Sequence, residues 1–222
     1  MEFFARLTEE TLPEADILRS APIIAAALQG GATRAQYIAF LTQAYHHVRH
    51  TVPLLMACGL RLPRRLEWLR VAVAHYIEDE IGHDAWILDD VAAANADVAA
   101  VRDGRPALET ELLVSYAYDT VMRQDAVGFF GMVYVLEGTS AALATRVANS
   151  LRDHLHLPDA ALTYLKRHGL VDTQHLDDLR GLLNRLDHVE DRTEVVHRAK
   201  VFFRLYGDVL RSIPKGVDHE YH

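Results

Sequence analysis

The chain has 222 residues, half of them hydrophobic, and a formal net charge of −8 at pH 7. This length and apolar content predict a single domain over residues 1–222, with a core large enough to need no disulfide. An acidic chain whose arginines are scattered argues against binding to nucleic acid or to an anionic membrane surface. We therefore expect no nucleic-acid partner and no membrane partner.

Cys58 is the only cysteine in the sequence, which excludes an intrachain disulfide and a cysteine-rich metal or iron–sulfur site. A buried structural thiol is the simplest interpretation of this residue. The N-terminal stretch carries early acids instead of a basic and apolar secretion signal, and no uncharged apolar run reaches the roughly 20 residues of a membrane span. We expect a cytoplasmic protein.

Apolar residues recur at the three- and four-residue spacing of helices, and the alternation typical of β-strands is missing. This pattern predicts a first helix over about residues 14–28, which ends at glycines 30–31. A second helix begins after Thr33, a good N-cap residue, and continues past Pro53, which is expected to kink it. A third helix covers about residues 65–93.

The second half of the chain continues in the same way. Residues 95–108 contain a glycine and a proline and are predicted to form a loop. A long helical region follows over about residues 108–154, with a break near Gln124. The next helix has Pro158 in its first turn and ends near Gly169, and two further helices close the chain. The whole pattern predicts an all-α bundle of about seven helices.

The stretch EDEIGHDAW, residues 78–86, places unusual polar chemistry inside the third predicted helix. Glu80 and His83 are three residues apart, so their side chains would share one helix face. A Glu-x-x-His pair on an inward face is how helical bundles present a carboxylate and an imidazole to one metal ion. Taken alone, the same pair more often belongs to a solvated helix face.

A second group of candidate ligands is His168, Asp172 and His175, which occupy positions i, i+4 and i+7. In a helix these positions lie along one stripe, and two imidazoles with a carboxylate suit Fe(II), Mn(II) or Zn(II). The competing interpretation is local, because Asp172 would also serve as the N-cap of a helix that begins near Thr173.

Glu137 lies in a strongly apolar run that also contains several glycines. Burying a lone carboxylate costs several kcal/mol unless it has a cationic partner, a hydrogen-bond donor or a metal. No arginine lies within helical reach, since the nearest are Arg123 and Arg146. Three histidines and three carboxylates from three helical segments would together serve two divalent ions: Glu80, His83, Glu137, His168, Asp172 and His175.

The order of these motifs resembles that of the heme-oxygenase-like diiron oxidases and oxygenases of the TenA/PqqC-like superfamily. The resemblance covers about residues 35–206 and is most specific at the motif His168-x3-Asp172-x2-His175. It implies a seven-helix bundle that binds two Fe(II) ions per chain through the six residues above and uses O2 as a cosubstrate. Glu80, Glu137 and Asp172 would be the catalytic carboxylates.

The same resemblance implies oxidation of a small organic molecule by N-oxygenation or oxidative cleavage. An amine, an amino acid or a heteroaromatic amine is the expected substrate. An external electron donor and a homodimer are further expectations. Four residues are expected to face the substrate: His47, His50, Phe130 and Tyr134. A role in the core or at the surface is the alternative for each of them.

Other activities of the superfamily stay open. A p-aminobenzoate-forming branch is disfavoured, because Leu136 precedes Glu137 and no lysine occurs between Glu137 and Lys166. Heme degradation is disfavoured because it would give the six candidate ligands no role. A metal-free enzyme of the thiaminase type would need Cys58, which follows an apolar run unsuited to a reactive thiolate. A cofactorless oxidase of the PqqC type and a non-enzymatic binding module on the same fold are the remaining alternatives.

Overall fold

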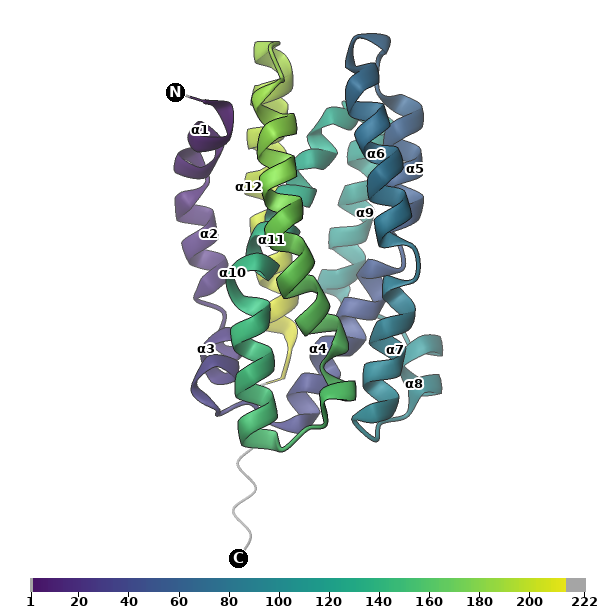
Figure 1. Ribbon diagram of the computed structural model, residues 1–222, viewed down its shortest axis with the longest axis vertical. Coiled ribbons are helices and arrows are strands. Elements are labelled where there is room, and N and C mark those ends of the chain that lie inside the picture. Colours follow the sequence, from purple (N-terminus) through teal and green to yellow (C-terminus); the bar gives the residue numbers. More distant parts are fainter. Residues whose placement is uncertain (1, 215–222) are drawn as a thin grey trace, which may run out of the picture.

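The computed structural model describes residues 2–214, and the side chains of these residues except 170–174. Within that range the chain folds into twelve α-helices and three short 3-10 helices, with no strand. The predicted all-α class is therefore confirmed, although the chain is divided into more segments than the seven expected. Most of the longer helices run along the long axis of the bundle (Figure 1).

The N-terminal segment forms three helices, α1 (Phe3–Glu10), α2 (Leu12–Arg19) and α3 (Pro22–Gln29), so the prediction of one helix over residues 14–28 is wrong. Pro22 explains the break. A proline disfavours helical backbone in the residue before it, and Ala21 accordingly has φ −59° and ψ 129°.

The second predicted helix is also divided, into α4 (Arg34–Val48) and α5 (Thr51–Arg61). Thr33 caps α4 as expected, and the side chain of Gln36 completes a reciprocal capping box with it. Pro53 lies in the first turn of α5, where its missing N–H is tolerated. The chain therefore breaks just before the proline instead of kinking at it.

The third predicted helix breaks at Ile81 and Gly82 into α6 (Glu67–Glu80) and α7 (His83–Ala93). Gly82 has φ 90°, a left-handed conformation that favours glycine. The predicted loop that follows contains the short helix α8 (Val98–Asp103).

The C-terminal half consists of three long helices after α9. The predicted break near Gln124 is confirmed, but the predicted end of a helix near Gly169 is wrong, because one helix runs through that residue. The bounds are α9 (Leu108–Arg123), α10 (Phe129–Leu155), α11 (Thr163–Asn184) and α12 (Val189–Ser212).

The central helix of the molecule is α10, which packs against both α11 and α12 (Figure 1). Its N-terminal part, including Phe130 and Val135, belongs to one buried apolar cluster, and its C-terminal part, including Ala144 and Ala148, belongs to another. Glu137 lies between these two parts. The segment 126–155 is long and apolar enough to cross a membrane by length and composition alone, but 61% of its most apolar window is buried in the bundle, as in a core helix.

Candidate metal centre

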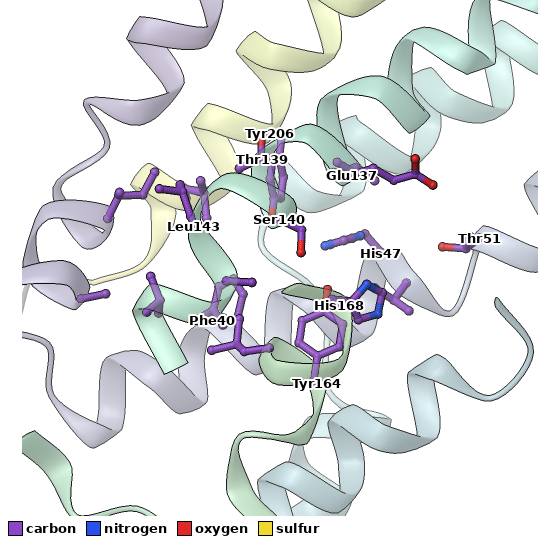
Figure 2. Close-up of a pocket in the computed structure, with 18 of the residues that line it drawn as sticks. Phe40, His47, Thr51, Glu137, Thr139, Ser140, Leu143, Tyr164, His168 and Tyr206 are labelled. Atoms are coloured by element: carbon purple, nitrogen blue, oxygen red, sulfur yellow. The ribbon is translucent and has the colours of Figure 1, made fainter. Parts of the chain in front are cut away.

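A cavity of about 170 Å³ lies inside the bundle and is lined by residues of α3, α4, α5, α6, α10, α11 and α12. Its carboxylate and imidazole side chains lie toward one end. Figure 2 shows His47, Glu137 and His168 on one side of the cavity, with Phe40 and Leu143 on the other. The predicted ligand residues lie at or beside the polar end.

Glu80 and His83 are brought together by the break in the third predicted helix, not by a continuous helical face. Gly82 turns the chain so that Nδ1 of His83 lies 3.0 Å from Oε2 of Glu80, and both side chains are largely buried. Burial raises the pKa of Glu80, but the hydrogen bond with His83 and the electrostatic influence of His83, His168 and His175 outweigh it, so the net shift is downward. Glu80 is therefore held as a carboxylate.

Glu137 is 8% exposed and receives contacts from two helices. The hydroxyl of Tyr76 on α6 donates to Oε2 of Glu137 at 3.5 Å. Burial, followed by the charge of Glu137, raises the pKa of Tyr76 well above its usual value, so this hydroxyl remains a proton donor. On the other side, Nδ1 of His175 lies 3.7 Å from Oε1 of Glu137, and its Nε2 lies 3.5 Å from a carboxylate oxygen of Asp79.

His168 joins the two ends of the polar region through ring contacts. Its imidazole lies edge-on to that of His83, with 4.7 Å between centroids, and packs against Tyr164 at 4.5 Å. His168 and His175 thus both approach the α6–α7 segment that carries Glu80 and His83. The structure brings together five of the six predicted ligands.

The side chain of Asp172, the sixth predicted ligand, lies outside the described residues. Its backbone is part of α11, which begins at Thr163. The interpretation of Asp172 as the N-cap of a separate helix near Thr173 is therefore wrong, and its role as a ligand stays a prediction.

Unpaired imidazole nitrogens test whether these residues suit a metal. Nδ1 of His47 and Nδ1 of His175 are buried and have no hydrogen-bond partner among the described residues. Each such atom costs about 1–3 kcal/mol, a cost that an ion or a ligand would remove. Neutral imidazole and carboxylate donors suit Fe(II), Mn(II) and Zn(II), so the residues present fit the iron that the motifs imply.

The coordination itself is not preformed in the described part of the chain. There, no three histidine, cysteine, aspartate or glutamate side chains already converge on one point. A metal site here requires the carboxylate of Asp172, a change of rotamers, or both.

The four predicted substrate-facing residues lie in three different places. His47 is 4% exposed and lines the cavity, and burial, with the charges of His168 and His50, lowers its pKa to about 4, so its imidazole is neutral. His50 lies in a separate groove, where its Nδ1 is 3.1 Å from the hydroxyl of Tyr118. Phe130 and Tyr134 are buried in the core and do not line the cavity.

Phe130 and Tyr134 do not line the cavity because of their angular position on α10 relative to Glu137. Val133, Ser140 and Val147, seven residues apart, all line the cavity and mark the centre of that face. Glu137 lies at the edge of the face, and Phe130 and Tyr134 lie beyond it. Core packing, the alternative held open for both aromatic residues, is what the structure shows; the hydroxyl of Tyr134 donates to Oγ1 of Thr8 at 3.4 Å.

Several polar residues that line the cavity were not predicted from the sequence. Tyr76 lies four residues before Glu80, and Ser140 lies three residues after Glu137, so helical spacing from the candidate ligands would have found both. Thr51 and Tyr206 also line the cavity, but no signal in their own segments points to it.

The motif order and this geometry agree with a comparison against protein families. The family described as iron-containing redox enzyme matches residues 38–207. The chain belongs to this family. The match confirms the heme-oxygenase-like superfamily inferred from the motifs, and the family is one of iron-containing redox enzymes. No curated protein matches the chain.

Solved structures confirm the fold of this family member. A domain of unknown function with a heme oxygenase-like fold from Shewanella denitrificans is 22% identical, with a TM-score of 0.84 over 96% of this chain and 92% of that one. A TenA homologue from Pseudomonas syringae pv. tomato is 12% identical, with a TM-score of 0.80 over 94% and 90%. The heme oxygenase of Leptospira interrogans is 15% identical, with a TM-score of 0.77 over 95% and 99%.

Proposed function

We propose that the protein is a non-heme dinuclear iron enzyme that uses O2 to oxidise a small organic substrate. The observation that carries this proposal is that five buried or largely buried ligand-type side chains from α6, α7, α10 and α11 lie in pairwise contact beside one cavity: Glu80, His83, Glu137, His168 and His175. Membership of an iron-containing redox family supports it.

Two Fe(II) ions held here would supply the reduction of O2 that an oxygenase needs. The chain's own residues would hold and orient them. Tyr76 fixes the direction of Glu137 through its hydrogen bond, as outer partners of ligand carboxylates do. His47, neutral and with an unpaired Nδ1, offers a hydrogen bond at the cavity wall. The apolar remainder of the wall excludes water from the reaction. N-oxygenation or oxidative cleavage of an amine or amino acid is the expected chemistry.

The test is anaerobic reconstitution with Fe(II), followed by measurement of iron per chain and of O2 consumption. We expect about two irons per wild-type chain. In Glu80→Ala and Asp172→Ala, iron affinity should fall by more than the roughly 10–100-fold that loss of an outer partner costs. Glu78→Ala is the matched control, because Glu78 lies on the same helix with an exposed side chain. Wild-type protein that holds no iron would contradict the proposal.

A metal-free binding module is the second candidate, and one observation favours it. Glu80 with His83, and Glu137 with His175, already contact each other as carboxylate–imidazole pairs, as an ion-pair network without a metal would. Iron binding in the reconstitution experiment would rule against this candidate. Heme is less well supported, because no lysine or arginine is found among the described residues of the cavity wall to pair with propionates.

Thiol chemistry of the thiaminase type has little support from the structure. Cys58 is fully buried in α5, and its Sγ lies 3.4 Å from the carbonyl oxygen of Ala126. Burial raises the pKa of this thiol to about 12. At neutral pH the thiolate needed for attack is therefore scarce, and Cys58 is absent from the described cavity lining.

A further inference from the structure

The cavity is much longer than a site for a small amine or amino acid would need to be. Helix α10 lines it from Phe129 to Leu151, and Glu137 lies 14 residues before the far end of that stretch. At 1.5 Å of rise per residue, these 14 intervals correspond to about 21 Å of helix. The carboxylates and imidazoles of the lining lie near Glu137, so most of this length is available to something other than the reacting group.

The remainder of the cavity, here called the apolar arm, is enclosed by side chains of α3, α4, α10 and α12. Figure 2 places Phe40 and Leu143 in it, away from Glu137 and Thr51. Its wall consists almost entirely of aliphatic and aromatic side chains, which include Ile23, Ala27, Phe40, Leu143, Val147 and Leu210.

The charges around the cavity restrict the head group of a ligand. The described lining residues include Glu80 and Glu137 but no lysine or arginine, and His47 is neutral. A carboxylate head group would therefore meet two acidic side chains and no lysine or arginine. An amine would meet acceptors: the two carboxylates and the hydroxyl oxygens of Thr51 and Ser140.

We infer that the substrate is an amphipathic amine, with its nitrogen at the polar end and an alkyl or arylalkyl group in the apolar arm. This inference rests on the proposed function for its reaction, but its binding part depends only on the cavity. Burial of hydrocarbon in a preformed apolar site is the main source of affinity for such a ligand. The apolar arm would then set the length of the group that the enzyme accepts.

The first test is a chain-length series of butylamine, hexylamine and octylamine. Binding is measured by calorimetry, without oxygen, for the metal-free protein and for protein loaded with Fe(II). Each methylene that enters the apolar arm should tighten binding about fourfold, so octylamine should bind roughly 200-fold more tightly than butylamine. Equal affinities along the series would overturn the inference.

The second test blocks the arm by substitution. Ala27 on α3 is buried and lines the arm, so Ala27→Phe should remove most of the advantage of octylamine while butylamine still binds as in the wild type. Ala25→Phe is the matched control, because Ala25 is on the same helix with an exposed side chain. Retained tight binding of octylamine to Ala27→Phe would contradict the assignment of the arm.

The head group is tested with octanoate. Octylamine should bind more tightly than octanoate to the metal-free protein, and the reverse order there would overturn the choice of an amine. The two proposals fail separately. Chain-length dependence in a protein that takes up no iron would support the apolar arm and refute the iron enzyme. Iron uptake with no chain-length dependence would support the iron enzyme and refute the apolar arm.

Discussion

Two glycines in the candidate ligand segments illustrate how differently one residue type can act. Gly82 lies between Glu80 and His83, and Gly169 directly follows His168. At Gly82 the backbone adopts φ 90° and the helix ends. At Gly169 the backbone is helical, and α11 continues without interruption. A glycine weakens any helix, yet the prediction had a helix continue through Gly82 and end near Gly169, the reverse of what the structure shows.

The difference lies in what surrounds each glycine. A Cβ atom at Gly82 would meet nothing within 4 Å, so only its left-handed backbone requires a glycine. A Cβ atom at Gly169 would lie 2.3 Å from Oγ1 and 2.9 Å from the backbone nitrogen of Thr145 on α10. Gly169 therefore lets α11 approach α10 closely beside His168. Gly82 shapes the site through its own backbone, and Gly169 through the packing of two helices.

The largest expected effect is that of Gly169→Ala. The added methyl group meets the backbone of Thr145, which cannot move aside as a flexible side chain would. Overpacking of this kind costs about 1–3 kcal/mol, and we expect the upper part of that range. Thermal unfolding measures it, with a decrease in Tm of roughly 5–10 °C. An unchanged Tm would show that α10 and α11 are not in close contact here.

A smaller effect is expected for Gly82→Ala. The methyl group has space, so the cost is the left-handed backbone alone, about 1–2 kcal/mol in unfolding free energy. Because Gly82 directs His83 toward Glu80, the same variant should also weaken Fe(II) binding. Gly82→Asn should lose less stability, since asparagine tolerates this conformation. Equal losses in the two variants would argue against backbone strain as the cause.

The smallest effect, of opposite sign, is expected for Gly181→Ala. Gly181 also lies within α11, but a Cβ atom there would meet nothing within 4 Å and the backbone is helical. Alanine should therefore stabilise the protein by about 0.5–1 kcal/mol. Chemical denaturation of this variant beside Gly169→Ala separates helix propensity from packing. A destabilised Gly181→Ala would mean that propensity does not govern exposed positions of α11.

The helical class followed from periodicity, but the division into segments depended on finer signals. The break before Pro22 could have been predicted from the restriction that a proline places on the preceding residue. The continuity of α11 through Gly169 could not have been predicted in this way. It depends on close packing against Thr145, which is 24 positions earlier in the sequence.

The candidate site was predictable where chemistry was unusual for its place in the sequence. Glu137 in an apolar run, and histidines spaced with carboxylates, identified the polar end of the cavity. His47 and His50 carry the same chemistry, yet only His47 reaches the cavity, because α4 ends between them. The apolar arm left no sequence signal, since its residues look like ordinary core.

The most direct test of the central claim is anomalous diffraction at the iron edge, from crystals grown without oxygen and soaked in Fe(II). We predict two iron peaks per chain, between the side chains of α6, α7, α10 and α11 that include Glu80, His83, Glu137, His168 and His175. Iron bound only elsewhere on the protein, with these five side chains still paired to one another, would contradict the account.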